Sequence, residues 1–176
     1  MSRLVLAKPD IGWEEEIRSY REAFPEDRMR VTWQEDRIPG MDGLENFRSI
    51  PDWLAYIHSA SGTISWYMAL RPGERKIIGF SCLRHSPEYD DDDPEFSSHI
   101  GLSIRPDERR KGYGEELLRL LLGHAKMLGL DTVRIVCRDI NTASRRMIAA
   151  AGGVYIDSIY GDESGMTVCR YNVPTL

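Results

Sequence analysis

The residues that point most clearly to chemistry are the basic run 109–111 (Arg-Arg-Lys) and the two glycines that follow it, Gly112 and Gly114. They lie between a strand-like segment that Pro106 ends and a helix-like segment that begins at Tyr113. The first amides of a helix lack internal partners and carry positive potential, so a helix start binds anions. Glycine lets the backbone approach a phosphate, and arginine holds a phosphate through parallel hydrogen bonds. The expected ligand is therefore a diphosphate.

Two other phosphate-binding motifs do not fit this segment. A P-loop requires a lysine after its glycine, whereas Lys111 precedes Gly112. A dinucleotide fingerprint requires a third glycine at position 117, which is Leu117. The pattern Arg-x-x-Gly-x-Gly between a strand and a helix instead resembles the acetyl-CoA motif of the GNAT superfamily of N-acetyltransferases.

A second segment strengthens the resemblance to the GNAT superfamily. Asn141, Ser144 and Gly152 match residues that members often carry around the next helix, while Gly153 stands where an aromatic residue is usual. The resemblance covers about residues 63–160 and is strongest over 99–153. We expect a single domain over 1–176, with a variable N-terminal part (1–62) and a cofactor-binding core (63–160).

The resemblance implies an α+β fold, with a central mixed, mainly antiparallel sheet flanked by helices and a β-α-β core that binds acetyl-CoA. The cofactor would lie where the parallel strands 97–105 and 132–137 diverge, and an amine would attack the thioester directly. Catalysis would come mostly from positioning and from polarising the carbonyl. No metal is implied. The implied cofactor-binding residues are Leu102, Ser103, Ile104, Arg109, Arg110, Lys111, Gly112, Tyr113, Gly114, Asn141 and Ser144.

The acid and base of the reaction are less clearly marked. Many family members place a tyrosine seven residues after the asparagine to protonate the leaving thiolate, and here that position is Ile148. Ser144 is our candidate substitute, with Tyr155, Tyr160 or water as alternatives. His99 is our candidate base, since an imidazole accepts a proton near neutral pH. His85 is the alternative, and either histidine could be purely structural.

The elements that must position these residues follow from periodicity and turn signals. Strands are expected at 4–8, 63–71, 76–85, 97–105 and 132–137, with closing strands at 154–160 and 166–173. Helices are expected at 11–24, 51–58, 113–128 and 141–151. The first should present Ile11, Ile17, Tyr20 and Phe24 on one face, and the third Leu117, Leu118, Leu121, Ala125 and Leu128. Residues 26–60 give the weakest pattern.

Composition and charge exclude several classes of protein. The net charge of −5 argues against a nucleic-acid-binding role for the basic turn, and no apolar run reaches a membrane span. We therefore expect a cytoplasmic protein without nucleic-acid or membrane partners; a homodimer stays open. The odd number of isolated cysteines (Cys82, Cys137 and Cys169) predicts buried thiols rather than disulfides or zinc ligands.

The acceptor is not identified beyond a small-molecule or peptide amine. The acidic segment 87–95 would attract a cationic acceptor, or it is only a solvated loop. The aromatic residues Trp33, Trp53, Trp66 and Tyr67 would line an acceptor pocket, or more simply form core. A non-catalytic acyl-CoA-binding sensor or interaction module is the alternative to an enzyme.

Overall fold

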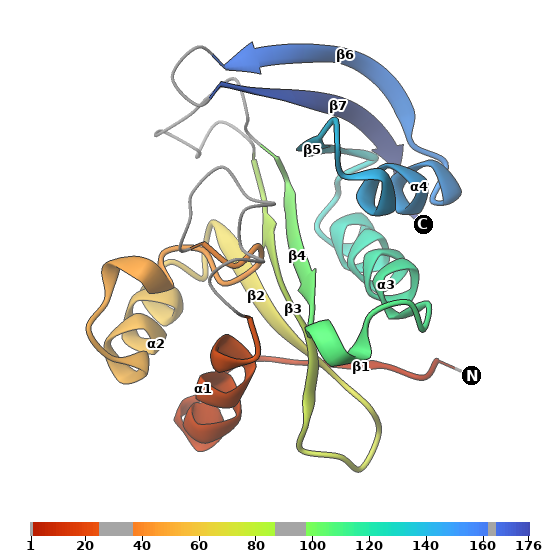
Figure 1. Cartoon of the computed structure of the whole chain (residues 1–176). Coiled ribbons are helices and arrows are strands. Elements are labelled where there is room, and N and C mark those ends of the chain that lie inside the picture. The colour runs from red at the N-terminus through yellow and green to blue at the C-terminus, as the bar shows by residue number, and fades with distance from the viewer. Residues whose placement is uncertain (1, 25–36, 87–97, 162–164) are drawn as a thin grey trace.

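The computed structural model describes residues 2–24, 37–86, 98–161 and 165–176, which form two antiparallel sheets (Figure 1). The first sheet has the order β1-β2-β3-β4 and the second the order β5-β7-β6. The strands of the first sheet are β1 (Val5–Ala7), β2 (Ile64–Leu70), β3 (Ile77–Arg84) and β4 (Ile100–Ile104). Those of the second are β5 (Thr132–Arg138), β6 (Val154–Gly161) and β7 (Met166–Pro174). The expected α+β class is confirmed.

Helices cover the two faces of the first sheet with separate cores. Helices α1 (Glu14–Glu22) and α2 (Ile50–Ser59) pack on one face, and α3 (Tyr113–Met127) packs on the other. Helix α4 (Thr142–Ala150) shares the core of α3 and lies against the second sheet. Alternation along β2 divides the two cores, since Trp66 and Met68 face α1 and α2 while Tyr67 and Ala69 face α3.

The first helical segment differs from the sequence prediction at its start. A 3-10 turn, η1 (Ile11–Trp13), precedes α1, and the side chain of Asp10 accepts a hydrogen bond from the amide of Gly12 there. Ile17 and Tyr20 are buried as expected, but Ile11 is 61% exposed, so its placement on the apolar face was wrong. The turn explains the error, because η1 does not continue the periodicity of the α-helix.

Helix α3 follows the predicted apolar stripe almost to its end. Leu117, Leu118, Leu121 and Ala125 are fully buried in the core between α3 and the first sheet. Leu128 is 45% exposed and was wrongly assigned to this stripe, because the helix ends at Met127. Gly129 follows with a φ of 84°, the left-handed conformation that favours glycine after a helix.

The remaining sequence expectations concern aromatic residues and thiols. Trp53, Trp66 and Tyr67 are buried, which confirms that they form core, and Trp33 and the acidic segment 87–95 lie outside the described residues. The three cysteines are buried and free, as expected. The weakly patterned N-terminal region contains another 3-10 turn, η3 (Leu44–Asn46), and α2, which begins at Ile50 and has Pro51 in its first turn. None of the helices in the described ranges is long and apolar enough to cross a membrane.

Candidate active site

The two sheets meet at the start of β4 and then separate. The backbone N–H of His99 donates to the carbonyl of Arg134 over 2.9 Å, so the first residues of β4 lie beside β5. Beyond this link β4 continues its ladder with β3, while β5 continues with β7. In the connection β4-α3-β5, the helix packs against the sheet and leads the chain from one diverging strand to the other (Figure 1).

The outer edge of β4 presents backbone groups toward this divergence. Arg84 N–H donates to His99 C=O, and Arg105 N–H donates to Ile78 C=O. Because bonded positions alternate in an antiparallel ladder, the N–H and C=O groups of Leu102 and Ile104 point away from β3. Two predicted cofactor residues therefore have backbone groups at this outer edge of the strand, where the Ile104 carbonyl also accepts a hydrogen bond from Arg109.

Ser103 lies at the intervening position of β4 and turns its side chain to the opposite face. Its backbone pairs with Phe80 in β3, and its hydroxyl donates to the carbonyl of Pro39 over 2.7 Å. The buried phenol of Tyr20 in α1 lies 3.0 Å from both the carbonyl and the hydroxyl oxygen of Ser103. Burial raises the pKa of Tyr20, so the phenol stays protonated and can donate. Ser103 thus fastens β4 to α1.

The turn after β4 leads directly into an uncapped helix start. A 3-10 turn, η5 (Pro106–Glu108), is followed by Arg110 with a φ of 61° and Gly112 with a φ of 81°. Gly112 is the N-cap residue of α3 and, as a glycine, has no side chain to cap it, and no other side chain in the described ranges accepts from its first-turn amides. The first-turn amides of α3 therefore keep the potential to bind an anion that the sequence predicted.

The three basic residues of the turn have different surroundings. Arg109 Nε donates to the carbonyl of Ile104 over 3.0 Å, and its guanidinium lies 5.5 Å from the ring centre of Phe24. Lys111 Nζ lies 2.7 Å from a carboxylate oxygen of Glu108. The side chain of Arg110 is exposed. Arg109 and Lys111 thus contact neighbouring groups of the turn, whereas the described residues give no contact for the exposed side chain of Arg110.

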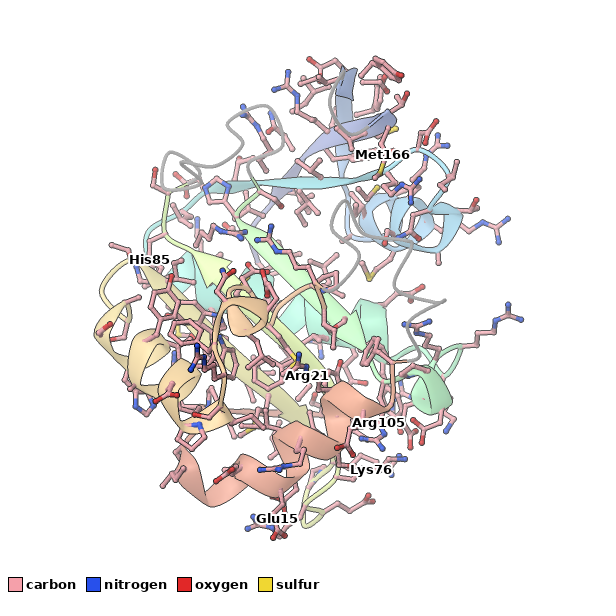
Figure 2. The ribbon with its side chains drawn as sticks, turned by 60° about the vertical axis from the view of Figure 1, so that its left-hand side comes forward. Glu15, Arg21, Lys76, His85, Arg105 and Met166 are labelled. Atoms are coloured by element: carbon pink, nitrogen blue, oxygen red, sulfur yellow. The ribbon has the colours of Figure 1, made fainter. Side chains whose placement is uncertain are left out.

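Glu108 organises this turn from a buried position. Its carboxylate accepts hydrogen bonds from Lys76 (2.5 Å), Lys111 (2.7 Å) and Arg71 (3.2 Å). Burial alone would raise its pKa, but the hydrogen bonds from Lys111 and Lys76 outweigh burial and lower the pKa to about 2. Lys76 also reaches Asp107, which pairs with Arg105; Figure 2 shows Lys76 and Arg105 at this end of the sheet. Glu108 therefore remains ionised and holds the turn against the β2–β3 connection.

Gly112 and Gly114 lack a side chain for different structural reasons. A Cβ atom at Gly114 would lie 3.2 Å from Met147 Sδ in α4 and 3.9 Å from Ile104 Cγ1 in β4. At Gly112 it would lie 3.1 Å from a guanidinium nitrogen of Arg3, and the positive φ disfavours a side chain there in any case. Gly114 therefore allows α3 to approach α4 and β4, in addition to the role expected of it toward a phosphate.

The start of α4 stands at the end of β5. Asn141 is the N-cap residue, and its Oδ1 accepts a hydrogen bond from the amide of Ser144 over 3.1 Å. Asn141 therefore caps the start of α4. Ile148 is fully buried in the core shared with α3, so the position where relatives carry a tyrosine holds a packing residue.

The candidate bases His99 and His85 lie at the same end of the β3–β4 ladder, where Arg84 pairs with His99, whereas the candidate tyrosines lie on β6. His99 is buried at the junction of β4 and β5, and its Nδ1 accepts a hydrogen bond from the amide of Arg134 over 2.9 Å. His85 lies at the far end of β3 (Figure 2), between Ser65 Oγ and the carbonyl of Gly62. Tyr155 and Tyr160 are on β6, which β7 separates from β5.

Several residues of this site escaped the sequence interpretation. Glu108, Tyr20 and Ser98 each depend on partners far along the chain, so local spacing gave no signal for them. Ser98 Oγ lies 3.3 Å from the amide of Val136 and 3.0 Å from the carbonyl of Ile100. For Glu108 the sequence offered one hint, an acidic residue directly before the basic run 109–111.

A family model described as an acetyltransferase (GNAT) domain matches residues 11–154. The chain belongs to the GNAT acetyltransferase family. The predictions of this family and of an acyltransferase enzyme are thereby confirmed. No curated protein sequence matches the chain.

Solved structures of acetyltransferases share the whole fold at low sequence identity. The microcin C7 self-immunity acetyltransferase MccE, in complex with acetyl-CoA and AMP, has a TM-score of 0.72 at 12% identity, over 99% of this chain and 93% of that one. The putative acetyltransferase yncA from Salmonella typhimurium with acetyl-CoA has a TM-score of 0.66 at 14% identity, over 98% and 94%. The ribosomal L7/L12 alpha-N-protein acetyltransferase RimL with coenzyme A has a TM-score of 0.69 at 14% identity, over 99% and 96%. At these identities the likeness shows the fold.

Proposed function

We propose that this GNAT protein transfers the acetyl group of acetyl-CoA to a primary amine, with the turn 109–114 as the diphosphate site. The observation that carries the proposal is the uncapped start of α3, placed directly after the strand whose outer edge is open. An anion at this helix start would receive hydrogen bonds from the first-turn amides. Similar folds with bound acetyl-CoA support the choice of cosubstrate.

Each part of acetyl-CoA has a candidate partner in this arrangement. Amides at the start of α3 and the side chain of Arg110 would bind the diphosphate. The backbone edge at Leu102 and Ile104 would align the pantetheine arm, which has the amide groups to pair with it. Arg109, Lys111, Tyr113, Asn141 and Ser144 complete the proposed cofactor contacts, with Ser103 fixing the strand behind them.

The reaction we propose is a direct transfer. The neutral amine nitrogen attacks the thioester carbonyl carbon, the carbon–sulfur bond breaks, and the thiolate takes up a proton while the new amide loses one. Positioning two reactants in one site supplies a large part of such a rate increase. A role for His99, as base or as a structural residue, and a role for Ser144 as proton donor to the thiolate remain predictions, as does a location in the cytoplasm.

The acceptor is proposed only as an amine class. Neighbouring structures include a spermidine N-acetyltransferase chimera, at 15% identity and a TM-score of 0.66, and the acetyltransferase of a ribosomal protein. Both support a primary amine on a small molecule or a peptide. A homodimer and the division into a variable part (1–62) and a core (63–160) also remain proposals.

One observation favours the non-catalytic alternative. Ile148 is buried where relatives carry the tyrosine acid, and the substitutes Tyr155 and Tyr160 lie on β6, which both β5 and β7 separate from β4. A protein that binds acyl-CoA without transfer needs no acid. The two functions separate in an assay that follows thiol release from acetyl-CoA with a panel of polyamines, amino acids, aminoglycosides and peptides.

A matched pair of glycine variants connects that assay to the site. Gly114→Val places a side chain between α3, α4 and β4, whereas Gly123→Val lies in the same helix where a Cβ atom meets nothing within 4 Å. We expect thiol release and acetyl-CoA binding from the wild type and from the Gly123 variant, and neither from the Gly114 variant. Acetyl-CoA binding without release for any amine would favour the non-catalytic module, and equal binding by both variants would contradict the assigned site.

A further inference from the structure

The junction between the two sheets is held mainly by side chains. Among the described residues, one backbone hydrogen bond joins the start of β4 to β5, from His99 N–H to the carbonyl of Arg134. The amide of Arg134 donates to His99 Nδ1 over 2.9 Å, and the amide of Val136 donates to Ser98 Oγ over 3.3 Å. Two amides of β5 that a regular ladder would pair with backbone carbonyls are therefore satisfied by an imidazole and a hydroxyl.

These contacts stand at the point where β4 and β5 begin to diverge. Ser98 and His99 are both buried, and the carbonyl of His99 also closes the ladder to Arg84 in β3. Arg84 further donates to the carbonyl of Ser98 over 2.9 Å. The pair therefore connects three consecutive strands, and its geometry fixes where the outer edge of β4 becomes open.

We propose that His99 and Ser98 form a side-chain clamp that positions β4 and β5 for acetyl-CoA, with His99 acting through Nδ1 as a positioning residue rather than as a catalytic base. A neutral imidazole that accepts at Nδ1 carries its proton on Nε2. Nε2 then has no lone pair available to take a proton from an amine. The clamp needs the lone pair of Nδ1 for the Arg134 amide, whereas a base would need a free lone pair on Nε2, so one neutral ring cannot serve both roles.

The clamp makes the site sensitive to acid. Burial, together with the positive charges of Arg134 and Arg84, lowers the pKa of His99 below its ordinary value. Within the described part of the chain, these two guanidinium groups are the charged side chains that act on the imidazole. The neutral ring and the clamp are therefore complete at pH 7 and are lost as the pH falls through the lowered pKa. A protonated Nδ1 would face the Arg134 N–H as a second donor.

Substitutions at His99 separate the two roles. In His99→Asn, Oδ1 takes the place of Nδ1 and preserves an acceptor for the Arg134 amide, but asparagine cannot act as a base. In His99→Gln the amide reaches toward the place of Nε2, and His99→Phe keeps a ring without an acceptor. Ser98→Thr and Ser98→Ala make the same comparison at the Val136 amide. His124→Asn, on α3 and bonded to Tyr67, is the histidine control.

The clamp itself is measured without any ligand, by hydrogen exchange of the Arg134 amide in nuclear magnetic resonance spectra. We expect exchange at least about tenfold faster in the Gln and Phe variants than in the wild type, since a buried amide loses its partner. The Asn variant and the His124 control should stay within about threefold of the wild type. Unchanged protection in the Phe variant would overturn the clamp, whatever the protein's activity.

The inference for catalysis rests on the proposed function, and its readouts are acetyl-CoA affinity and the pH profile of kcat/KM. We expect the Phe and Gln variants to bind acetyl-CoA about tenfold or more weakly. The Asn variant should keep the wild-type kcat and affinity near neutral pH. It should lack the fall of kcat/KM at acidic pH that protonation of His99 causes in the wild type. A His99→Asn protein with normal affinity but no turnover would identify His99 as the base and overturn the positioning role. Failure of the wild type to bind acetyl-CoA would refute the proposed function, while the exchange result would still decide the clamp.

Discussion

The buried carboxylate of Glu108 gives the sharpest test of how the diphosphate turn is held. Its side chain is 4% exposed and contacts three cations, which together lower its pKa from the ordinary 4.5 to about 2. At about 1.36 kcal/mol for each pH unit, this difference corresponds to about 3 kcal/mol of folding free energy at pH 7. We therefore expect Glu108→Gln to lose about 3 kcal/mol in urea denaturation followed by circular dichroism.

The sign of the pH dependence follows from the lowered pKa of Glu108. The stabilisation is complete above the unfolded-state pKa and is lost as the pH falls toward about 2. At pH 3.5 the unfolded carboxyl is largely protonated, so about 1.4 kcal/mol of the difference between wild type and Glu108→Gln should already be gone.

Glu115→Gln, an exposed change in the first turn of α3, is the matched control for Glu108→Gln and should stay within about 0.5 kcal/mol of the wild type. A destabilisation by Glu108→Gln that is equal at pH 7 and pH 3.5 would show that Glu108 acts through packing, and the ion-pair reasoning would be refuted.

Two further substitutions test the supports of β4 and α4. Tyr20→Phe removes the hydroxyl that donates to Ser103. We expect the free energy of unfolding to fall by about 1–2 kcal/mol in thermal or urea denaturation, and the KM for acetyl-CoA to rise. A Tm and a KM equal to those of the wild type would contradict this coupling of α1 to β4. Asn141→Ala removes the acceptor for the Ser144 amide and should lower the free energy of unfolding by about 1 kcal/mol, whereas Asn141→Asp should retain most of that stabilisation. Equal losses of stability in both variants would count against the cap.

The parts of the fold that were predictable are those whose causes are local. The stripe Leu117–Leu121 needs only the helical period, and the start of α3 needs only the glycines at 112 and 114. The capping of α4 by Asn141 follows from one side chain and the amide of Ser144. In each case the interacting groups lie within a few residues of one another, so spacing alone carries the information.

The parts that sequence interpretation missed depend on contacts between distant segments. Glu108 pairs with Lys76, and Tyr20 bonds Ser103, in each case across more than thirty residues of chain. The errors at Ile11 and Leu128 have a different origin, since both lie where a helix gives way to another conformation and the apolar period no longer decides burial.

Glycine 114 shows how one residue can satisfy two requirements. Its place in the motif predicted close approach to a phosphate, and the structure adds the close approach of α3 to Met147 and Ile104. A sequence pattern cannot separate the two reasons, because both require the absence of a side chain. Measuring both stability and acetyl-CoA affinity for Gly114→Val separates them experimentally, with Gly123→Val as the control for a valine in the same helix.

The most direct test of the central claim is a calorimetric titration of the wild-type protein with acetyl-CoA and, in parallel, with acetyl-pantetheine, which lacks the diphosphate. If the start of α3 binds the diphosphate through its amides and cations, acetyl-CoA should bind at least about a hundredfold more tightly, since hydrogen bonds to a charged group contribute about 1.5–3 kcal/mol each. Adenosine diphosphate should compete with acetyl-CoA. Equal affinities for acetyl-CoA and acetyl-pantetheine would show that the turn 109–114 does not hold the diphosphate and would contradict the account.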